Sequence, residues 1–221
     1  MIVTLDEGDI GPRNAPPVRR VLNAGSGPPS NRQLHAIFTN PGWQEIRLDI
    51  DPEARPDLVG SIMNMAALVP NGSFDAVWSS HSLEHLYSHE VPRALAEIVR
   101  VLKPEGFALI TSPDLEAVAS LILERDLHGT AYISPVGPIT PHDMLFGHSG
   151  SVAQGRHYMA HKTGFTCTSL GQLLADAGFA VVLVKRDRLD LWALALMESA
   201  DKAAIQRDLK ACGLDMLDEQ G

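Results

Sequence analysis

Cysteine, aromatic side chains and long apolar runs are all scarce in this sequence. Two cysteines, Cys167 and Cys212, are too few for a disulfide framework, so we expect a reducing, cytoplasmic setting. No apolar run approaches the length of a membrane-spanning helix, and residues 1–17 lack the basic start and apolar middle of a signal peptide. We therefore expect neither a secreted disulfide scaffold nor a membrane partner.

Dense runs of basic residues are missing as well. The formal net charge is −9, and an acidic surface repels phosphate backbones. Residues 185–188 are the most basic stretch, but Asp187 interrupts them, so we interpret them as a solvated hairpin turn. The sequence therefore predicts no nucleic-acid partner.

The sequence does contain enough apolar material for one large core. It has 221 residues, of which 45% are hydrophobic and 20% charged, which is typical of a globular α/β domain. Residues 1–17 are polar and end in two prolines, so we expect an N-terminal arm. Residues 18–221 are expected to form a single domain.

Short apolar segments and helical patterns alternate along that domain. Strands are predicted at 18–24, 45–50, 57–60, 74–79, 107–111, 180–184 and 191–197, and helices at 30–38, 89–102, 169–177 and 199–211. Such alternation is typical of a mostly parallel sheet with helices on both faces. The last two strands are joined by a charged turn, which predicts an antiparallel C-terminal hairpin. The expected fold is a Rossmann-like, seven-stranded α/β sheet.

The segment from about residue 126 to 163 breaks this pattern. It holds Pro135, Pro138, Pro141 and five glycines, with little periodicity. A loop of this length within a compact domain is usually functional or disordered. We expect an insert that acts as a lid and forms part of an acceptor pocket.

A glycine turn directly follows the first predicted strand. Gly25 and Gly27 allow a tight turn and a close approach of the backbone to a ligand. Asp49 ends the second strand, where an acid can accept both hydroxyls of a ribose. A dinucleotide fingerprint needs a third glycine, but Ser30 stands there and two prolines precede it. The pattern therefore favours an adenosine-type cofactor without a pyrophosphate.

At these residues the chain resembles the class I S-adenosylmethionine-dependent methyltransferases of the methyltransferase type 11 kind. The likeness covers roughly residues 18–125 and resumes at 166–197. Five segments carry it in order: VLNAGSG at 21–27, LDIDP at 48–52, SFDAVWS at 73–79 with LEH at 83–85, VLKPEGF at 101–107, and LLADAGF at 173–179. The resemblance implies S-adenosylmethionine as cofactor and methyl transfer to a small-molecule acceptor, which no residue pattern identifies.

The resemblance also implies a set of cofactor-binding residues along the strand ends. They would hold the methionine and ribose at 23–27, the ribose hydroxyls at 49, adenine at 50 and 61–63, and the methionine end at 79–81. The set is Asn23, Ala24, Gly25, Ser26, Gly27, Asp49, Ile50, Ser61, Ile62, Met63, Ser79, Ser80 and His81.

Two of these residues depart from the family pattern. The family usually has Asp or Glu at the position of Asn23, and commonly Asp at that of Ser61. An amide or hydroxyl still forms hydrogen bonds but supplies no charge for the ammonium or sulfonium group. An alternative is therefore a non-catalytic or degenerate module on the same fold.

Histidines suggest two further hypotheses. His81, Glu84 and His85 match the H-x-x-E-H pattern of inverted zinc peptidases, which would make the chain a zinc hydrolase. That pattern needs a continuous helix, whereas His81 directly follows a predicted strand, so we expect no metal. In the insert, His148 and His161 are the candidate acceptor contacts or bases, because a histidine titrates near neutral pH.

Overall fold

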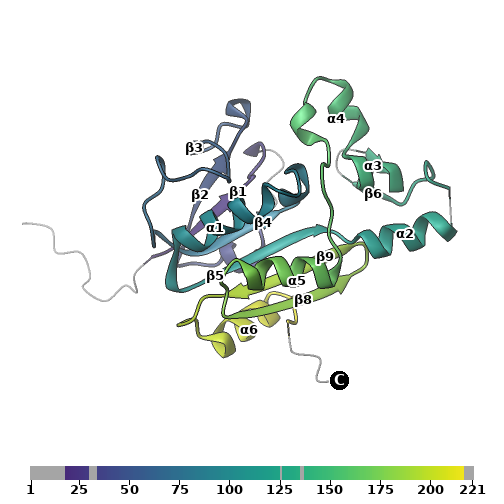
Figure 1. Ribbon diagram of the computed structural model, residues 1–221. Coiled ribbons are helices and arrows are strands. Elements are labelled where there is room, and N and C mark those ends of the chain that lie inside the picture. The colour runs from purple at the N-terminus through teal and green to yellow at the C-terminus, as the bar shows by residue number, and fades with distance from the viewer. Residues whose placement is uncertain (1–17, 30–33, 125, 135–136, 217–221) are drawn as a thin grey trace, which may run out of the picture.

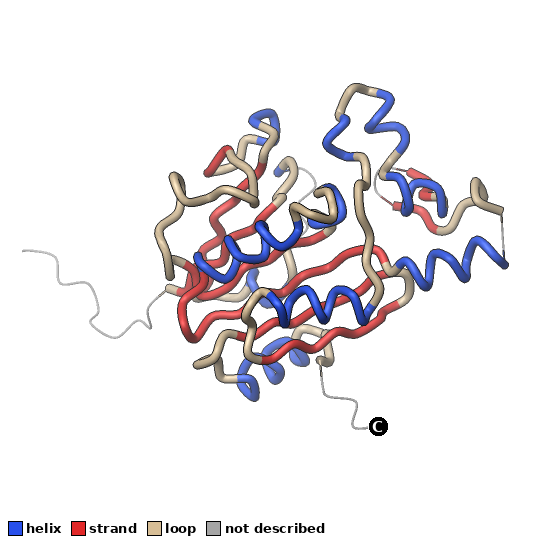
Figure 2. Tube along the Cα trace, in the orientation of Figure 1, coloured by secondary structure: helices blue, strands red, loops and turns tan. Residues whose placement is uncertain are grey.

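One mixed sheet organises the chain. The computed structural model describes residues 18–29, 34–124, 126–134 and 137–216, so the predicted arm at 1–17 lies outside the described residues. The sheet has seven strands in the order β3-β2-β1-β4-β5-β9-β8, which confirms the predicted fold (Figures 1 and 2). Its strands are β1 (Arg19–Ala24), β2 (Trp43–Asp49), β3 (Leu58–Val59), β4 (Phe74–Ser80), β5 (Leu102–Pro113), β8 (Val181–Asp187) and β9 (Asp190–Leu196).

Strand direction decides where the functional residues gather. β1 pairs in parallel with β2 and with β4, and β5 pairs in parallel with β4. β9 runs antiparallel to β5 and to β8, as the predicted C-terminal hairpin requires. The carboxyl ends of β1, β2 and β4 therefore meet at one edge of the sheet, which is where open α/β sheets bind ligands.

Helices cover both faces of the sheet. α1 (Val91–Val101) and α5 (Cys167–Asp176) pack on one face, in front of the sheet in Figure 1. The short helix η2 (Ala36–Thr39) and α6 (Lys202–Ala211) pack on the other. In α1 the residues Val91, Ala94, Leu95, Ile98 and Val101 are buried, which is the spacing of one helical face. Among the described residues, no helix is long and apolar enough to span a membrane.

Two helical segments differ from the expectation. The helix predicted at 30–38 is a 3-10 turn at 36–39 in its described part, and its proposed cap, Ser30, lies outside the described residues. His35 caps the turn instead, because its Nδ1 accepts the N–H of Ile37 at 3.3 Å. The sequence pattern also missed α2 (Leu115–Glu124), whose mostly aliphatic residues give no clear polar face.

The insert contains more regular structure than its sequence suggests. A small hairpin, β6 (Tyr132–Ser134) and β7 (Gly137–Ile139), precedes α3 (Pro141–Phe146), α4 (Ser149–Ala153) and η5 (His157–Met159). Figure 1 shows this lobe beside the outer end of α2. Val118 of α2 packs with Ile139 and Met144, so α2 and the lobe share a small core. These elements are too short for periodicity to reveal them.

Asp143 holds the start of α3 and should make the insert sensitive to acid. Its carboxylate accepts hydrogen bonds from the backbone and hydroxyl of Thr140 and of Ser149. Burial alone would raise the pKa of Asp143, but these donors outweigh burial and lower it below its ordinary value of 3.8. A carboxyl whose pKa is lowered by folding stabilises the fold above its unfolded pKa, and that stability is lost as the pH falls through the folded pKa.

We therefore expect Asp143→Asn to be less stable than the parent chain at neutral pH, by about 1 kcal/mol, as for other cap losses. The difference should start to shrink as the pH falls through about 4, near the pKa of the unfolded carboxyl, and should keep shrinking toward the lower folded pKa, because unfolding of the parent chain then takes up a proton. Urea unfolding of both chains over this range measures it. A difference that stays constant with pH would contradict the assignment.

Candidate functional site

The glycine turn after β1 lies against the end of β2. The N–H groups of Gly25 and Ser26 both donate to the carbonyl of Leu48, at 2.9 and 3.1 Å. Gly25 and Gly27 have φ angles of +75° and +60°, which residues with a β-carbon rarely adopt. Ala24 and Ser26 are buried, while Gly25 is exposed. The predicted turn thus exists and leaves backbone accessible at the sheet edge.

Asp49 ends β2 beside this turn, as the sequence predicts. Its Oδ2 accepts the N–H of Gly27 at 2.8 Å, and its Oδ1 accepts the N–H of Asp51 at 2.9 Å. A carboxylate has about four acceptor positions, so both oxygens keep capacity for further donors. The arrangement can present a negatively charged double acceptor to a diol.

Arg47 is a structural residue of this site that sequence reasoning missed. Its guanidinium donates to the carbonyls of Gly27, Ala54 (3.1 Å) and Arg55 (2.9 Å). It thereby joins the glycine turn to the segment after β2. Its place two residues before Asp49 puts both on the same face of the strand, and that spacing was the available signal.

Asn23 is buried and has a charged partner. Its side-chain amide donates to Glu45 Oε1 at 2.7 Å, across from β1 to β2. The acid that the family usually carries at position 23 is therefore replaced here by an amide paired with a carboxylate on the neighbouring strand. Negative charge is present close to Asn23, although not on it.

The hydrogen bond between Asn23 and Glu45 predicts that an acidic residue at position 23 would destabilise this chain. Asn23→Asp would set two carboxylates against each other in a buried place, so we expect the free energy of unfolding to fall by about 2 kcal/mol. The double variant Asn23→Asp/Glu45→Gln restores a donor–acceptor pair and should recover most of the loss. Urea unfolding of the three chains tests this, and equal stability of Asn23→Asp and the parent would disprove it.

The residues expected around adenine lie on the loops after β2 and β3. Ile50 has 59% of its surface exposed, a large value for an aliphatic side chain next to a strand end. Ser61, Ile62 and Met63 are half-buried in a turn in which Ser61 Oγ accepts the N–H of Met63 at 3.2 Å.

The residues expected near the methionine end lie at the end of β4. Ser79 is fully buried and Ser80 accepts a hydrogen bond from Thr111 at 3.1 Å. His81 leaves the strand with a φ of +50°. Its Nδ1 lies 3.3 Å from Glu84 Oε1 and its Nε2 lies 3.6 Å from Asp190 Oδ1. Burial alone would lower the pKa of His81, but Glu84 and Asp190 outweigh it and raise the pKa.

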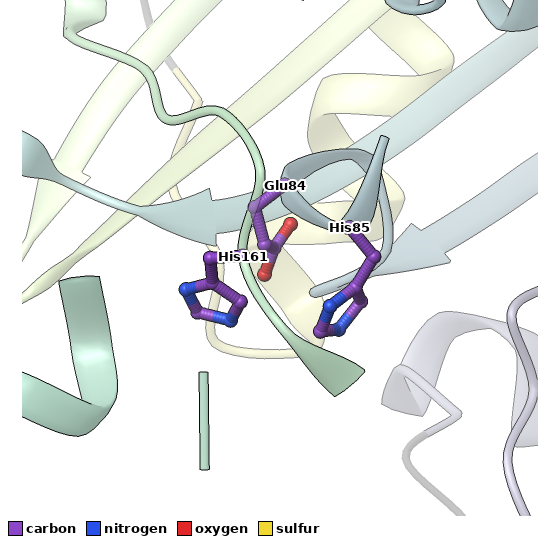
Figure 3. A group of neighbouring side chains, drawn as sticks. All are labelled: Glu84, His85 and His161. Carbon is purple, nitrogen blue, oxygen red and sulfur yellow. The ribbon is translucent and has the colours of Figure 1, made fainter. Parts of the chain in front are cut away.

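Glu84, His85 and His161 come together although α1, β5, α2 and most of the insert lie between them in sequence (Figure 3). Each offers a ligand-type atom, and these atoms all lie within 4.8 Å of one another. His161, one of the two predicted acceptor contacts, is held here by a contact of its Nδ1 with the carbonyl of Met144 at 2.9 Å. The zinc-peptidase pattern fails: Glu84 and His85 lie in η4 (Leu83–His85), a single 3-10 turn, and His81 lies outside it.

The other predicted insert histidine occupies a different position. His148 is the N-cap of α4, where its Nδ1 accepts the N–H of Ser151 at 3.3 Å and contacts its hydroxyl at 2.9 Å. This nitrogen is therefore engaged in holding the helix start. Its role as an acceptor contact stays a prediction.

The insert is tied back to the cofactor side of the sheet by Tyr158. Its hydroxyl donates to Asp51 Oδ2 at 2.6 Å, two residues beyond Asp49. Partial burial and the Asp51 carboxylate raise the pKa of Tyr158 to about 12, so the hydroxyl keeps its proton at neutral pH. The backbone N–H groups of Lys162 and Thr163 also donate to the carbonyl of Glu84. The lobe thus contacts the ends of both β2 and β4.

Two hollows flank the sheet. One, of about 280 Å³, adjoins the His161 cluster and is lined by Leu115, Leu145, Phe146, His161, Lys162, Thr163 and Gly164. The other, of about 360 Å³, includes Arg19 and Trp43, the first residues of β1 and β2, and so lies at the opposite edge of the sheet. Only the first is beside the candidate site.

Methyltransferases are among the known proteins that this chain resembles in sequence and in fold. Residues 22–110 match a family model described as a methyltransferase domain, and no curated protein matches the chain. An S-adenosylmethionine-dependent methyltransferase from Archaeoglobus fulgidus is 17% identical, with a TM-score of 0.55 over 80% of this chain and 86% of that one. One from Methanosarcina mazei is 20% identical, with a TM-score of 0.54 over 82% and 93%. The family model thus covers residues 22–110, from β1 into β5, and the chain shares the overall fold of these S-adenosylmethionine-dependent methyltransferases.

Proposed function

We propose that the protein catalyses transfer of the methyl group of S-adenosylmethionine to a small-molecule acceptor. The observation that carries this proposal is the placement of Asp49 against the N–H of Gly27, where β1 and β2 end side by side. A carboxylate that could accept two ribose hydroxyls therefore lies next to the backbone of the glycine turn, which supports the proposal. It is the combination that an adenosine cofactor needs.

The cofactor would lie along the strand ends. In this proposal Asp49 accepts the ribose hydroxyls, Ile50 packs against adenine, and residues 61–63 line the adenine edge. Residues 23–27 and 79–81 line the methionine part. The exposed apolar surface of Ile50 supports its role, because ligand contact would remove it from water.

Methyl transfer depends mainly on how the acceptor and the cofactor are positioned relative to each other. A lone pair of the acceptor forms a bond to the methyl carbon while the carbon–sulfur bond breaks and its electrons return to sulfur, giving S-adenosylhomocysteine. Holding the two reactants in line supplies most of the acceleration in such a step. An acceptor that attacks through a hydroxyl must also give up a proton, for which His148 and His161 remain the proposed bases.

The acceptor would enter from the insert. The 280 Å³ hollow is lined by apolar side chains from α2 and α3 and by His161 and Lys162, a mixture typical of small-molecule pockets. Its size favours a small compound over a polymer. The cytoplasmic location stays a prediction, as does the absence of a nucleic-acid partner.

Calorimetric titration with S-adenosylmethionine and S-adenosylhomocysteine is the first test. We expect both to bind with one site per chain. Methyl-labelled S-adenosylmethionine incubated with the protein and a fractionated pool of small metabolites should then give a labelled product. Titrations that show no heat with either compound would refute the proposal.

The alternative is a module that binds the cofactor without turnover. It is favoured by the amide at Asn23, which adds no charge of its own at the position where the family usually has an acid. This alternative predicts normal titration curves together with no labelled product from any fraction.

A further inference from the structure

Two elements far apart in sequence form one cluster beside the proposed acceptor hollow. Glu84 and His85 come from η4, directly after β4, and His161 comes from the end of the insert. Figure 3 shows the Glu84 carboxylate directed between the two imidazole rings. The ring centroids of His85 and His161 are 5.0 Å apart, and the planes are inclined at 62°, so the rings are not stacked on each other.

Both imidazoles are oriented through their Nδ1 atoms. His85 Nδ1 lies 3.3 Å from the carbonyl of Ala160, and His161 Nδ1 lies 2.9 Å from the carbonyl of Met144. A carbonyl accepts only, so each Nδ1 is the protonated nitrogen and each Nε2 carries the lone pair. A backbone carbonyl on one ring nitrogen is the usual support of a histidine that binds a metal through the other.

Glu84 is the group that this cluster leaves unsatisfied. The carboxylate is 1% exposed, and neither oxygen has a hydrogen bond of normal geometry from the described residues. The imidazole of His81 lies 3.3 Å from one of these oxygens, on one side only. A buried carboxylate without normal hydrogen bonds calls for a further positive partner.

We propose that Glu84, His85 and His161 bind one divalent first-row transition-metal ion through a carboxylate oxygen and two Nε2 atoms. One carboxylate and two imidazoles form a donor set used by zinc and by other ions of this series. Donor atoms within 4.8 Å of one another can reach bonds of about 2.1 Å to a common centre with small side-chain movements. This differs from the expectation of a metal-free site, because the sequence pattern pointed to His81 rather than His161.

The proposed metal site lies beside the proposed acceptor hollow, which suggests a role for the ion in binding the acceptor. This role rests on the proposed function. Three protein ligands leave coordination positions open, and His161 also lines the 280 Å³ hollow. An acceptor whose oxygen binds the ion would be oriented and would lose its hydroxyl proton more easily. With metal bound, His161 would be a ligand and could not act as the base, so His148 would be the remaining candidate for that role. The substrate class would then be a small compound with a metal-binding hydroxyl or carboxylate oxygen.

Metal binding can be measured without cofactor or acceptor. We would deplete the full chain of metal with a chelator, remove the chelator, and titrate Zn²⁺ by equilibrium dialysis with metal analysis. We expect one Zn²⁺ per chain, and Co²⁺ should give the visible absorption bands of a nitrogen- and oxygen-bound ion. Glu84→Gln, His85→Gln and His161→Gln should each weaken binding roughly 100-fold or more.

His142→Gln is the matched control, because it removes an insert histidine outside the cluster, and it should bind metal like the parent chain. Circular dichroism checks the fold of each variant; if Glu84→Gln fails to fold, His161→Gln carries the test. No bound ion in the parent, or equal affinity in the parent and the folded ligand variants, would overturn the proposal. Titration of the metal-depleted chain with S-adenosylhomocysteine tests the proposed function separately.

Discussion

Gly25→Ala is expected to abolish measurable binding of S-adenosylhomocysteine and to lower the free energy of unfolding by about 3 kcal/mol. The backbone at this residue has a φ of +75°, which costs a residue with a β-carbon roughly 1 kcal/mol or more. The added β-carbon would also lie 2.1 Å from Ser82 Oγ and 2.9 Å from Ser82 Cβ. Ser82 cannot easily move away, because its hydroxyl donates to the carbonyls of Ala24 and Ser80. The glycine turn, which we propose faces the cofactor, must therefore shift.

Gly27→Ala is the matched control for backbone strain. Its φ is +60°, but a β-carbon there meets no atom within 4 Å, so we expect a loss of only about 1 kcal/mol. Gly25→Ala/Ser82→Gly removes the two contacting atoms and should recover the part of the loss caused by overlap. Urea unfolding and titration with S-adenosylhomocysteine measure both effects. Equal destabilisation by the two single substitutions would show that the contact with Ser82 is unimportant.

The fold could be predicted because its signals are local. Most sheet strands are short apolar segments, and β1, β2, β3, β5 and β8 end at or directly before glycine, proline or aspartate. Helices alternate with the first strands in the order that a parallel sheet requires. The proximity of Gly27 and Asp49 followed from the same rule, since parallel neighbours end at the same edge. α2 was missed for a physical reason: Val118 is its buried residue and Leu123 is 89% exposed, so no polar face marks it as a helix.

The site was only partly predictable. The cluster of Glu84, His85 and His161 depends on the path of the insert, which is fixed by contacts such as those of Lys162 and Thr163 with the carbonyl of Glu84. No spacing along the chain encodes such contacts. The H-x-x-E-H pattern identified two of the three residues and chose His81 as the third, because a pattern of adjacent residues cannot include a distant one.

Asp49→Ala is expected to weaken binding of S-adenosylhomocysteine by roughly 100-fold. The substitution removes the proposed acceptor of both ribose hydroxyls, and two hydrogen bonds to a charged group contribute together about 3 kcal/mol. It also removes the acceptors for the N–H groups of Gly27 and Asp51, so some affinity is lost through the glycine turn itself. Calorimetric titration gives the total effect, and Glu53→Gln, a nearby exposed carboxylate, should leave the affinity unchanged.

Asp49→Asn separates the two contributions. The amide oxygen can still accept one of the backbone N–H groups, but the substitution removes the negative charge and replaces an acceptor by a donor. If Asp49 binds the ribose directly, affinity stays at least about 10-fold below that of the parent even where the unfolding free energy recovers. Recovery of full affinity together with stability would instead assign Asp49 to holding the glycine turn. The carboxylate at the end of β2 would then support the cofactor site from behind without touching the ribose.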